Sequence, residues 1–419
     1  MLLSSVEMAA CLCVARRQGC LRSAIFLAPC GELLRTKVIL MRIAFISTYP
    51  PIECGIGAYT CYLNEALKKL NNETFVVSQI GAQGKNVFPI FSLESVSLGS
   101  ELFSVCDKIT PDVIHVQHEY GLYGSQKGVQ IADFILRCKL AGEPVVTTLH
   151  TVHSDLEEFE KIILRIVVGE SSAIIVHEDY QKETLVRYLG QEEKIHVIPH
   201  GVREVSPIPD AKEKLGIEGK KVILLCGYFR PTKGFSEVVE WFPEICEMMD
   251  DVVLVIAGKS RGLEFREYQR RFFEAINNSS VNDKILVLRG QFPQHTFDTI
   301  VSASDVVILP YDLGGQSGIM SQCFAFGKPV VTSNLLAFKI ILKKCKGGFT
   351  CETKQDYLEK IATILNDTIL AESLRENINN YVDQKVGWSK IAQSHIKVYQ
   401  SVVRVPYGKA RYVNWDDNE

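Results

Sequence analysis

The chain has 419 residues, of which 47% are hydrophobic and 23% charged, and its net charge is -3. This composition excludes an intrinsically disordered or fibrous protein. The nearly balanced charge excludes a protein that attracts nucleic acid through its overall field. Because a single core rarely grows beyond about 250–300 residues, the length predicts two domains with a cleft between them.

The first 40 residues differ from the rest of the chain, since they carry five Lys or Arg side chains and two Glu. A basic, acid-poor segment is compatible with an organellar transit peptide. We favour instead a start assigned too far upstream, so that residues 1–40 are an extension and the folded chain begins at Met41. No uncharged run reaches the roughly 18–20 apolar residues that a membrane-spanning helix needs.

The chain contains 13 cysteines, and none of them show the paired C-x-x-C spacing of a zinc site. Scattered cysteines in apolar surroundings favour a reducing compartment over a disulfide framework. We therefore expect a cytoplasmic protein.

From residue 41 to residue 202, short β-branched runs alternate with longer helical patterns. This alternation predicts a parallel sheet. The continuous apolar character of residues 43–46 and 174–176 indicates strands that helices cover on both faces. We therefore predict an α/β, doubly wound, Rossmann-like domain over 41–202, with strands at 42–47, 75–80, 113–117, 144–149, 173–176 and 195–198.

A proline-containing connector over residues 205–209 separates this series from a second one. The second series predicts another Rossmann-like domain over 203–386. Residues 387–419 form the last segment, in which an amphipathic helix over 388–403 is expected to cross back towards the first domain before a polar tail. The strands expected in the second domain are 222–226, 252–257, 285–288, 306–309 and 329–332.

The loop after the first strand, residues 47–59, contains Gly55 and Gly57 and leads into a helix expected to begin near Ala58. Glycines at a helix N-terminus let phosphate oxygens approach backbone amides. A nicotinamide-binding loop would be shorter and would need an acidic residue at the end of the second strand. Residues 77–79, Val-Ser-Gln, stand there instead, which disfavours a dehydrogenase.

Histidines stand at the ends of the third and fourth strands. Ligands of open α/β sheets bind at the carboxyl ends of the strands, so His118, Glu119 and His150 are expected to face the substrate. His115 is expected to be a buried strand residue. The carboxylates Glu119 and Asp155 do not fall at metal-ligand spacing, so we expect no metal.

The second domain offers two cations, Arg230 and Lys233, in a glycine-rich turn after its first strand. An arginine fork and a lysine point charge could together neutralise a diphosphate. The alternative is that both are solvated loop cations.

A glycine-rich loop follows the strand at 306–309, and a helix is expected to start near Ser317. The free amides of Ser317, Gly318 and Ile319 would then face the ligand at the positive end of the helix dipole.

Taken together, these motifs make residues 41 to about 403 resemble the retaining family-4 glycosyltransferases (glycosyl transferases group 1) of GT-B fold. The similarity lies in six short motifs that occur in the family's order. They are P-P-x-x-C-G-x-G, H-V-Q-H-E-Y-G-L-Y-G, T-L-H-T, I-P-H-G-V, P-T-K-G and A-F-G-K-P-V-V.

The resemblance implies an α/β enzyme of two Rossmann-like domains that transfers a sugar from a nucleotide-diphosphate donor, such as a GDP- or UDP-linked hexose, to a hydroxyl of a glycan or lipid-linked acceptor. It implies retention of configuration and no metal or cofactor. The donor would lie in the second domain, which makes the first the acceptor side. In this comparison Lys233 matches the lysine that holds the diphosphate, and 317–319 match the amide cradle. Gly55 would approach the phosphates from the first domain, and His118 matches the histidine near the transferred sugar.

The chain departs from the family pattern in three places. Tyr228 stands where an arginine is common, although Arg230 follows two residues later. The family's two signature glutamates fall on Gly314 and Gln322, and only Gln322 can still hydrogen-bond a ribose hydroxyl. These losses leave open a non-catalytic or regulatory GT-B subunit, or another GT-B enzyme such as a sugar-nucleotide epimerase.

Residues 338–346 contain four lysines beside apolar residues. Such a stretch is compatible with peripheral contact at the cytoplasmic face of a membrane, although a basic helix face is more often solvated. The sequence does not indicate an oligomeric state.

Overall fold

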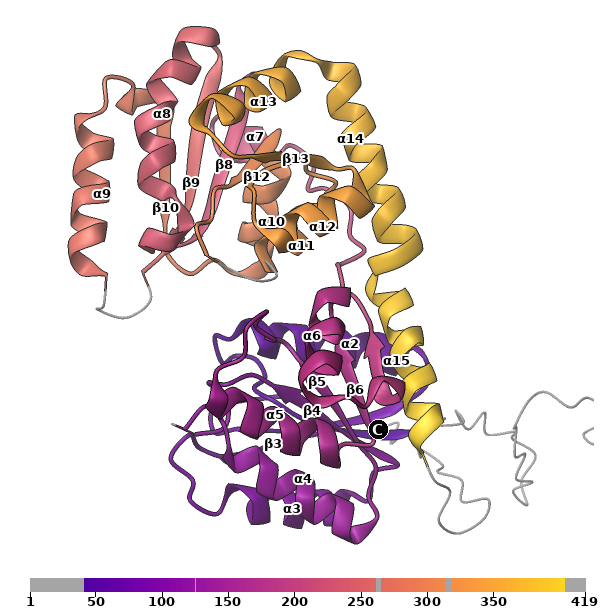
Figure 1. Ribbon diagram of the computed structural model, residues 1–419. Helices are drawn as coiled ribbons and strands as arrows, with labels where there is room; N and C mark the ends of the chain where they lie inside the picture. Colours follow the sequence, from indigo (N-terminus) through magenta and orange to yellow (C-terminus); the bar gives the residue numbers. More distant parts are fainter. Residues whose placement is uncertain (1–40, 125, 261–264, 314–317, 404–419) are drawn as a thin grey trace, which may run out of the picture.

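Two parallel sheets, each covered by helices, lie one above the other in the computed structural model (Figure 1). The structure describes residues 41–124, 126–260, 265–313 and 318–403. The expected extension 1–40 and the polar tail lie outside the described residues.

The first sheet has seven strands in the order β3-β2-β1-β4-β5-β6-β7, all parallel. The strand order reverses between β1 and β4, which is where doubly wound sheets bind ligands. The strands are β1 Arg42–Ile46, β2 Glu73–Gln79, β3 Val87–Phe91, β4 Val113–His118, β5 Val145–Leu149, β6 Ala173–Val176 and β7 Ile195–Val197. The helices around them are α2 Gly55–Lys69, α3 Leu98–Ile109, α4 Gln130–Ala141, α5 Glu158–Glu170 and α6 Asp179–Leu189.

The second sheet has six parallel strands in the order β10-β9-β8-β11-β12-β13, which repeats the pattern of the first. The predicted fold of two Rossmann-like units is therefore confirmed. The strands are β8 Lys221–Tyr228, β9 Val252–Lys259, β10 Ile285–Arg289, β11 Val306–Leu309, β12 Val330–Ser333 and β13 Gly348–Cys351. The helices are α7 Ala211–Lys214, α8 Phe235–Met248, α9 Arg266–Asn278, α10 Gln294–Ala303, α11 Gly318–Phe324, α12 Leu336–Cys345, α13 Lys354–Asn366 and α14 Thr368–Tyr381.

Two strands were not predicted, and both lie at sheet edges. Strand β3 is only partly buried and contains Pro89, which a sheet tolerates only where no ladder hydrogen bond is needed from it. Strand β13 has four residues and begins with Gly348, so it lacks the β-branched run that marks a strand. An added Cβ at Gly348 would lie 2.0 Å from the carbonyl oxygen of Val330, so only glycine allows β13 to pair this closely with β12.

The chain returns to the first sheet through α14, a π-helical turn over Val382–Val386, and α15, Trp388–Val402. Figure 1 shows this yellow segment running along one side of the molecule from the second sheet to the first. Helix α15 packs against α2, and an isolated β-bridge joins Val202 to Gly387. The domain boundaries at 202/203 and 386/387 remain predictions.

Helix α15 enters the core of the first unit through two aromatic side chains. An added Cβ at Gly201 would lie 2.4 Å from the Trp388 ring, so the ring sits directly on the linker backbone. The Tyr399 hydroxyl is fully buried and lies 2.6 Å from Nδ1 of His115, which is itself 0% exposed. Burial lowers the pKa of His115 well below its usual value, so this contact joins two neutral groups.

None of the helices in the described part of the chain is long and apolar enough to cross a bilayer.

Removing the Tyr399 hydroxyl tests how firmly α15 is held. Tyr399→Phe leaves Nδ1 of His115 buried without this partner, which costs about 1–3 kcal/mol. We expect a lower urea midpoint with an unchanged m-value. Ser394→Ala is the matched control on the same helix, because that hydroxyl donates only to the Lys390 carbonyl oxygen; its midpoint should hardly change. Equal midpoints for both variants would contradict this account of α15.

Candidate functional site

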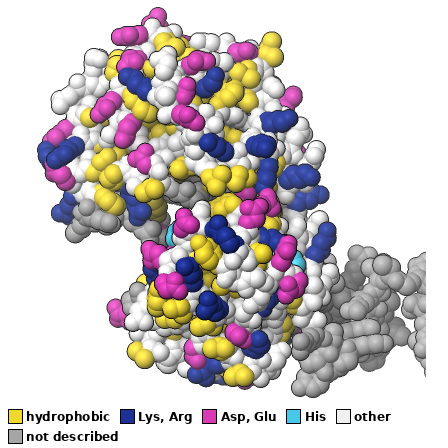
Figure 2. Space-filling model, in the orientation of Figure 1, with side chains coloured by type: hydrophobic (Ala, Val, Ile, Leu, Met, Phe, Trp, Pro, Cys, Tyr) yellow, Lys and Arg dark blue, Asp and Glu magenta, His cyan; other side chains and the backbone are white. Residues whose placement is uncertain are grey.

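A cavity of about 900 Å³ lies between the two sheets, and we call it the large cavity. Figure 2 shows the molecule hollowed between its upper and lower halves. The first unit contributes Gly55, Glu119, His150 and neighbouring residues to the wall, while the second contributes residues at the starts of α11 and α12. Because each β-strand of a parallel sheet points the same way, the carboxyl ends of both sheets can face one shared space.

A second cavity of about 410 Å³ lies at the carboxyl ends of β8, β9 and β10, and we call it the glycine-lined cavity. Gly227, Gly258 and Gly290 border it. An added Cβ at Gly258 would lie 2.0 Å from the Gly227 carbonyl oxygen, so these strand ends stay close only without side chains. Cys54 and Gly318 line both cavities, which therefore adjoin.

Lys233 lines the glycine-lined cavity. It ends a short 3-10 turn after β8, and its Nζ lies 3.4 Å from the centre of the Tyr311 ring. Among the described residues it forms no ion pair. Burial, together with the neighbouring charge of Arg230, lowers the pKa of Lys233 to about 8.

Arg230 lines neither cavity. Its guanidinium carbon lies 5.8 Å from the centres of both the Tyr228 and Phe265 rings, and its Nε is buried without a hydrogen-bond partner. The two predicted cations are thus brought near each other, but only Lys233 faces the cavity.

Helix α11 begins at Gly318, and Gly318 and Ile319 border the glycine-lined cavity. Ser317 and Gly314 lie outside the described residues. Gln322 lines neither cavity, because its Oε1 accepts hydrogen bonds of 3.0 and 2.8 Å from Arg203.

Arg203 explains the position of Gln322. Its guanidinium also forms an ion pair with Asp298 at 2.6 Å, and its side chain is largely buried. Since Arg203 and Gln322 are 119 residues apart, no local sequence pattern predicts this contact. A ribose hydroxyl would have to share Gln322 with the arginine.

The two glycines of the first loop have different surroundings. The helix expected near Ala58 begins at Gly55 instead, so both glycines lie in the first turn of α2. Gly55 lines the large cavity and has open space where a Cβ would be. Gly57 lines neither cavity; a Cβ there would lie 3.3 Å from Thr48 Oγ1, so this glycine allows close helix packing.

His118 ends β4, as expected, but it is fully buried and lines neither cavity. Its imidazole meets the Tyr120 ring edge-on, with centroids 5.4 Å apart. Neither ring nitrogen has a hydrogen-bond partner, and the Tyr120 hydroxyl is also buried without one. Burial lowers the pKa of His118 to about 4, so the ring is neutral at pH 7.

His150 does lie on the wall of the large cavity. Both of its nitrogens contact other side chains, since Nε2 lies 2.8 Å from Gln117 Oε1 and Nδ1 lies 3.3 Å from His177 Nε2. His150 therefore presents the carbon edge of its ring to a ligand.

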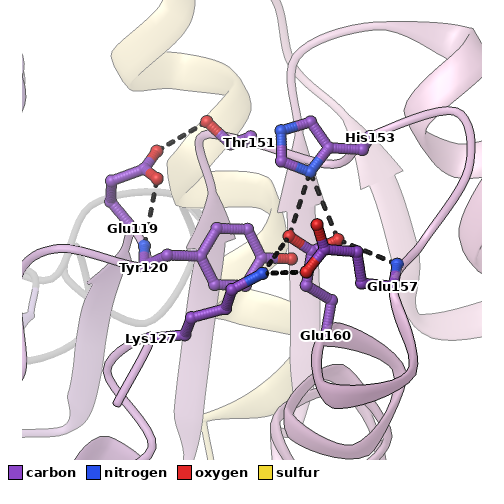
Figure 3. Close-up of polar contacts among 7 residues, drawn as sticks. All are labelled: Glu119, Tyr120, Lys127, Thr151, His153, Glu157 and Glu160. Carbon is purple, nitrogen blue, oxygen red and sulfur yellow. Dashed lines mark hydrogen bonds and ion pairs between the residues drawn. The ribbon is translucent and has the colours of Figure 1, made fainter. Parts of the chain in front are cut away.

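Glu119 also lines the large cavity, and its carboxylate is held in place at the strand end. One oxygen accepts a 2.6 Å hydrogen bond from the Thr151 hydroxyl, and the other accepts one of 3.0 Å from the backbone amide of Tyr120 (Figure 3). Of the three residues expected on the acceptor side, Glu119 is the one with a polar group fixed at the cavity.

The sequence did not assign a role to His153, which lies on the cavity wall next to Glu119 and Thr151. Its Nδ1 is 3.2 Å from both oxygens of Glu160. Glu160 is 2% exposed and also forms an ion pair of 3.1 Å with Lys127. The clue in the sequence was the place of His153 just after a strand end.

Several residues of the glycine-lined cavity were also missed. They end β9 or follow β10, where the strand-end rule would have located them: Gly258, Lys259, Gly290, Gln291 and Phe292. Lys259 forms an ion pair with Glu53 of the other unit, and both side chains border the cavity.

Over the residues that the structure describes, no group of three or more His, Cys, Asp or Glu side chains is arranged to hold a metal ion.

Comparison with known proteins matches two family models to the two units. The first, Glycosyltransferase Family 4, matches residues 55–204, and the second, Glycosyl transferases group 1, matches residues 207–381. A similar curated protein is a phosphatidyl-myo-inositol mannosyltransferase of Mycobacterium leprae, 26% identical over 63% of this chain and 69% of the relative. Another is the N-acetyl-alpha-D-glucosaminyl L-malate synthase of Bacillus anthracis, 21% identical over 86% of this chain and 97% of the relative.

Solved structures of similar fold extend over both units. Anabaena HepE in complex with UDP-glucose matches with a TM-score of 0.66 and 16% identity, covering 86% of this chain and 100% of that one. Sucrose-phosphate synthase from Thermosynechococcus elongatus matches with a TM-score of 0.68 and 16% identity, covering 86% and 98%.

The two family models meet at the linker and together match residues 55–204 and 207–381, in the order that the sequence motifs predicted. The chain is a glycosyltransferase that belongs to family 4 and has the GT-B fold.

Proposed function

We propose that the chain transfers a hexose from a UDP- or GDP-linked donor to a hydroxyl of a glycan or lipid-linked acceptor, with retention of configuration and without a metal or cofactor. It would act in the cytoplasm, or at the cytoplasmic face of a membrane, in glycan, polysaccharide or glycolipid synthesis. The observation that carries this proposal is Lys233, a half-buried lysine without an ion pair among the described residues, in a cavity that adjoins the large one.

Lys233 is suited to the donor diphosphate because a half-buried cation attracts an anion more strongly than a solvated one does. The backbone at Gly318 and Ile319 borders the same cavity and supplies amides at the start of α11. Arg230 adds positive charge from behind Lys233 without direct access to the cavity. This arrangement supports a diphosphate site formed by one side chain and the backbone.

The rest of the glycine-lined cavity has the character of a nucleoside site. Three glycines leave space for a flat ligand, while Phe292 and Phe297 provide apolar surface. HepE of Anabaena, which shares the fold, was solved with UDP-glucose. These features favour a UDP-linked donor.

The reaction would take place where the two cavities adjoin. The bond between the anomeric carbon and the diphosphate oxygen breaks, and the acceptor oxygen bonds to that carbon on the same face. The proton of the acceptor hydroxyl passes to the leaving diphosphate, so no protein base is required. Lys233 and the α11 amides stabilise the charge that develops on the leaving group.

His118 remains our sugar-side candidate because both of its nitrogens lack partners. Contact with the donor sugar would require the Tyr120 ring, which packs edge-on against the imidazole, to move away. A neutral imidazole could then hydrogen-bond a sugar hydroxyl.

Transfer activity and its dependence on Lys233 test the proposal. The purified chain, given UDP- and GDP-hexoses with a set of sugar acceptors, should release nucleoside diphosphate and form a glycoside. Lys233→Ala should lower kcat/KM about 100-fold, since a positioned donor at a developing anion contributes roughly 3 kcal/mol. Lys397→Ala, an exposed lysine on α15, is the control and should keep full activity.

Two other outcomes point to the alternatives. Donor binding without turnover would indicate a non-catalytic subunit, whereas conversion of the donor sugar without any acceptor would indicate an epimerase. Turnover that survives Lys233→Ala would contradict the diphosphate site.

The low pKa of Lys233 predicts a pH-dependent affinity for nucleoside diphosphate. The side chain is a cation below its folded pKa of about 8 and loses its charge above it. Affinity should therefore be complete near pH 7 and fall as the pH rises through and beyond 8. Because the bound anion favours the charged lysine, the midpoint in the complex should lie above 8.

Isothermal titration with UDP and with GDP between pH 7 and pH 10 measures this fall. Lys233→Arg keeps its charge over the whole range, so this variant should bind with little pH dependence. The same decline in both proteins would show that another group titrates.

A further inference from the structure

We propose that one wall of the large cavity is built to bind an uncharged polyhydroxyl group and to reject a phosphate or carboxylate beside the reacting hydroxyl. This wall, which we call the acceptor-side wall, consists of Glu119, Thr151 and His153, with Glu160 behind them. The inference rests on the proposed function, which it deepens by naming the class of acceptor.

The charges around the large cavity support this assignment. Among the described residues that line it, Glu119 is the one carboxylate, and there is no lysine or arginine. Among the described lining residues, a ligand in this cavity therefore meets one carboxylate and no lysine or arginine side chain.

Two cations lie near the wall: Arg187 donates a hydrogen bond to the backbone carbonyl oxygen of Ser154, and Lys127 is held by two carboxylates. Its Nζ forms ion pairs with Glu157 at 2.5 Å and with Glu160 at 3.1 Å (Figure 3). Although burial alone would raise the pKa of Glu160, hydrogen bonds from Lys127 and His153 hold it below its usual value. Glu160 is therefore ionised, and the charge of Lys127 is balanced by its ion pairs with Glu157 and Glu160.

The wall presents hydrogen-bond acceptors. Glu119 is fixed by the Thr151 hydroxyl and the Tyr120 amide, yet an ionised carboxylate has about four lone-pair sites, so it can accept further bonds from a ligand. His153 faces Glu160 with Nδ1, which must carry the proton because its partner is a carboxylate.

The Glu119 carboxylate matches sugar hydroxyls, which can donate hydrogen bonds to it. Phosphate and carboxylate groups offer no donor when ionised, and like charges placed together across an interface are repelled. The phosphate of an inositol phosphate would meet the Glu119 carboxylate, and no lysine or arginine among the described lining residues balances it. The wall thus selects by charge as well as by hydrogen bonding.

A test compares acceptors that differ by a single phosphate. The full chain and an active donor are assayed with methyl α-mannoside, methyl α-glucoside and myo-inositol, and with methyl α-mannoside 6-phosphate, methyl α-glucoside 6-phosphate and inositol 1-phosphate. Binding of the same six compounds is measured by saturation-transfer NMR in the presence of UDP. We expect kcat/KM and binding to favour the neutral members at least about tenfold.

Glu119→Gln is the decisive variant, because it keeps an oxygen for the Thr151 hydroxyl and removes the charge. It should bring the neutral and phosphorylated members to within about twofold to threefold of each other. Glu94→Gln, an exposed residue that does not border the cavity, should leave the wild-type ratio unchanged. Thermal melts confirm that both variants are folded.

Three results would overturn the inference: equal or better use of the phosphate esters, a ratio that Glu119→Gln does not alter, or no use of any neutral polyol while the donor is still hydrolysed. If no donor is consumed at all, the proposed function fails. The binding ratios from NMR, with and without Glu119→Gln, would then still decide whether the wall selects by charge.

Discussion

The packing of α15 on the first unit is the interaction on which the rest of the structure depends. A GT-B site exists only where the carboxyl ends of two parallel sheets face each other, and neither sheet alone closes the large cavity. The Trp388 ring packs against the linker backbone at Gly201, and Tyr399 lies in the core of the first unit beside His115. The β-bridge between Val202 and Gly387 brings the two crossing segments together where they pass between the units.

In this arrangement the two units contribute different kinds of side chain to the two cavities. The second unit provides a cavity of glycines, aromatic rings and the half-buried Lys233, which is suited to a flat, anionic nucleotide. The first unit provides a carboxylate and imidazoles, which are suited to hydroxyl groups. Because Cys54 and Gly318 line both cavities, the sugar of a donor bound in the glycine-lined cavity would extend into the large cavity. The ion pair between Glu53 and Lys259 crosses between the units at the border of the glycine-lined cavity.

Local sequence patterns predicted the strands well because a strand that is buried on both faces is a continuous apolar run. They failed at β3 and β13, which are edge strands held by pairing rather than by burial. The strand-end rule directed attention to Glu119 and Lys233, which line the two cavities, since that position follows from topology. It could not show that Tyr120 covers His118, or that Gln322 is held by an arginine 119 residues away. Those contacts depend on packing between distant segments.

A crystal structure of the chain with a UDP-linked hexose tests the central claim most directly. The account predicts the diphosphate against Lys233 and the amides of Gly318 and Ile319, the uracil in the glycine-lined cavity, and the sugar pointing into the large cavity towards Glu119. A nucleotide bound elsewhere, or a diphosphate that does not contact Lys233, would contradict it.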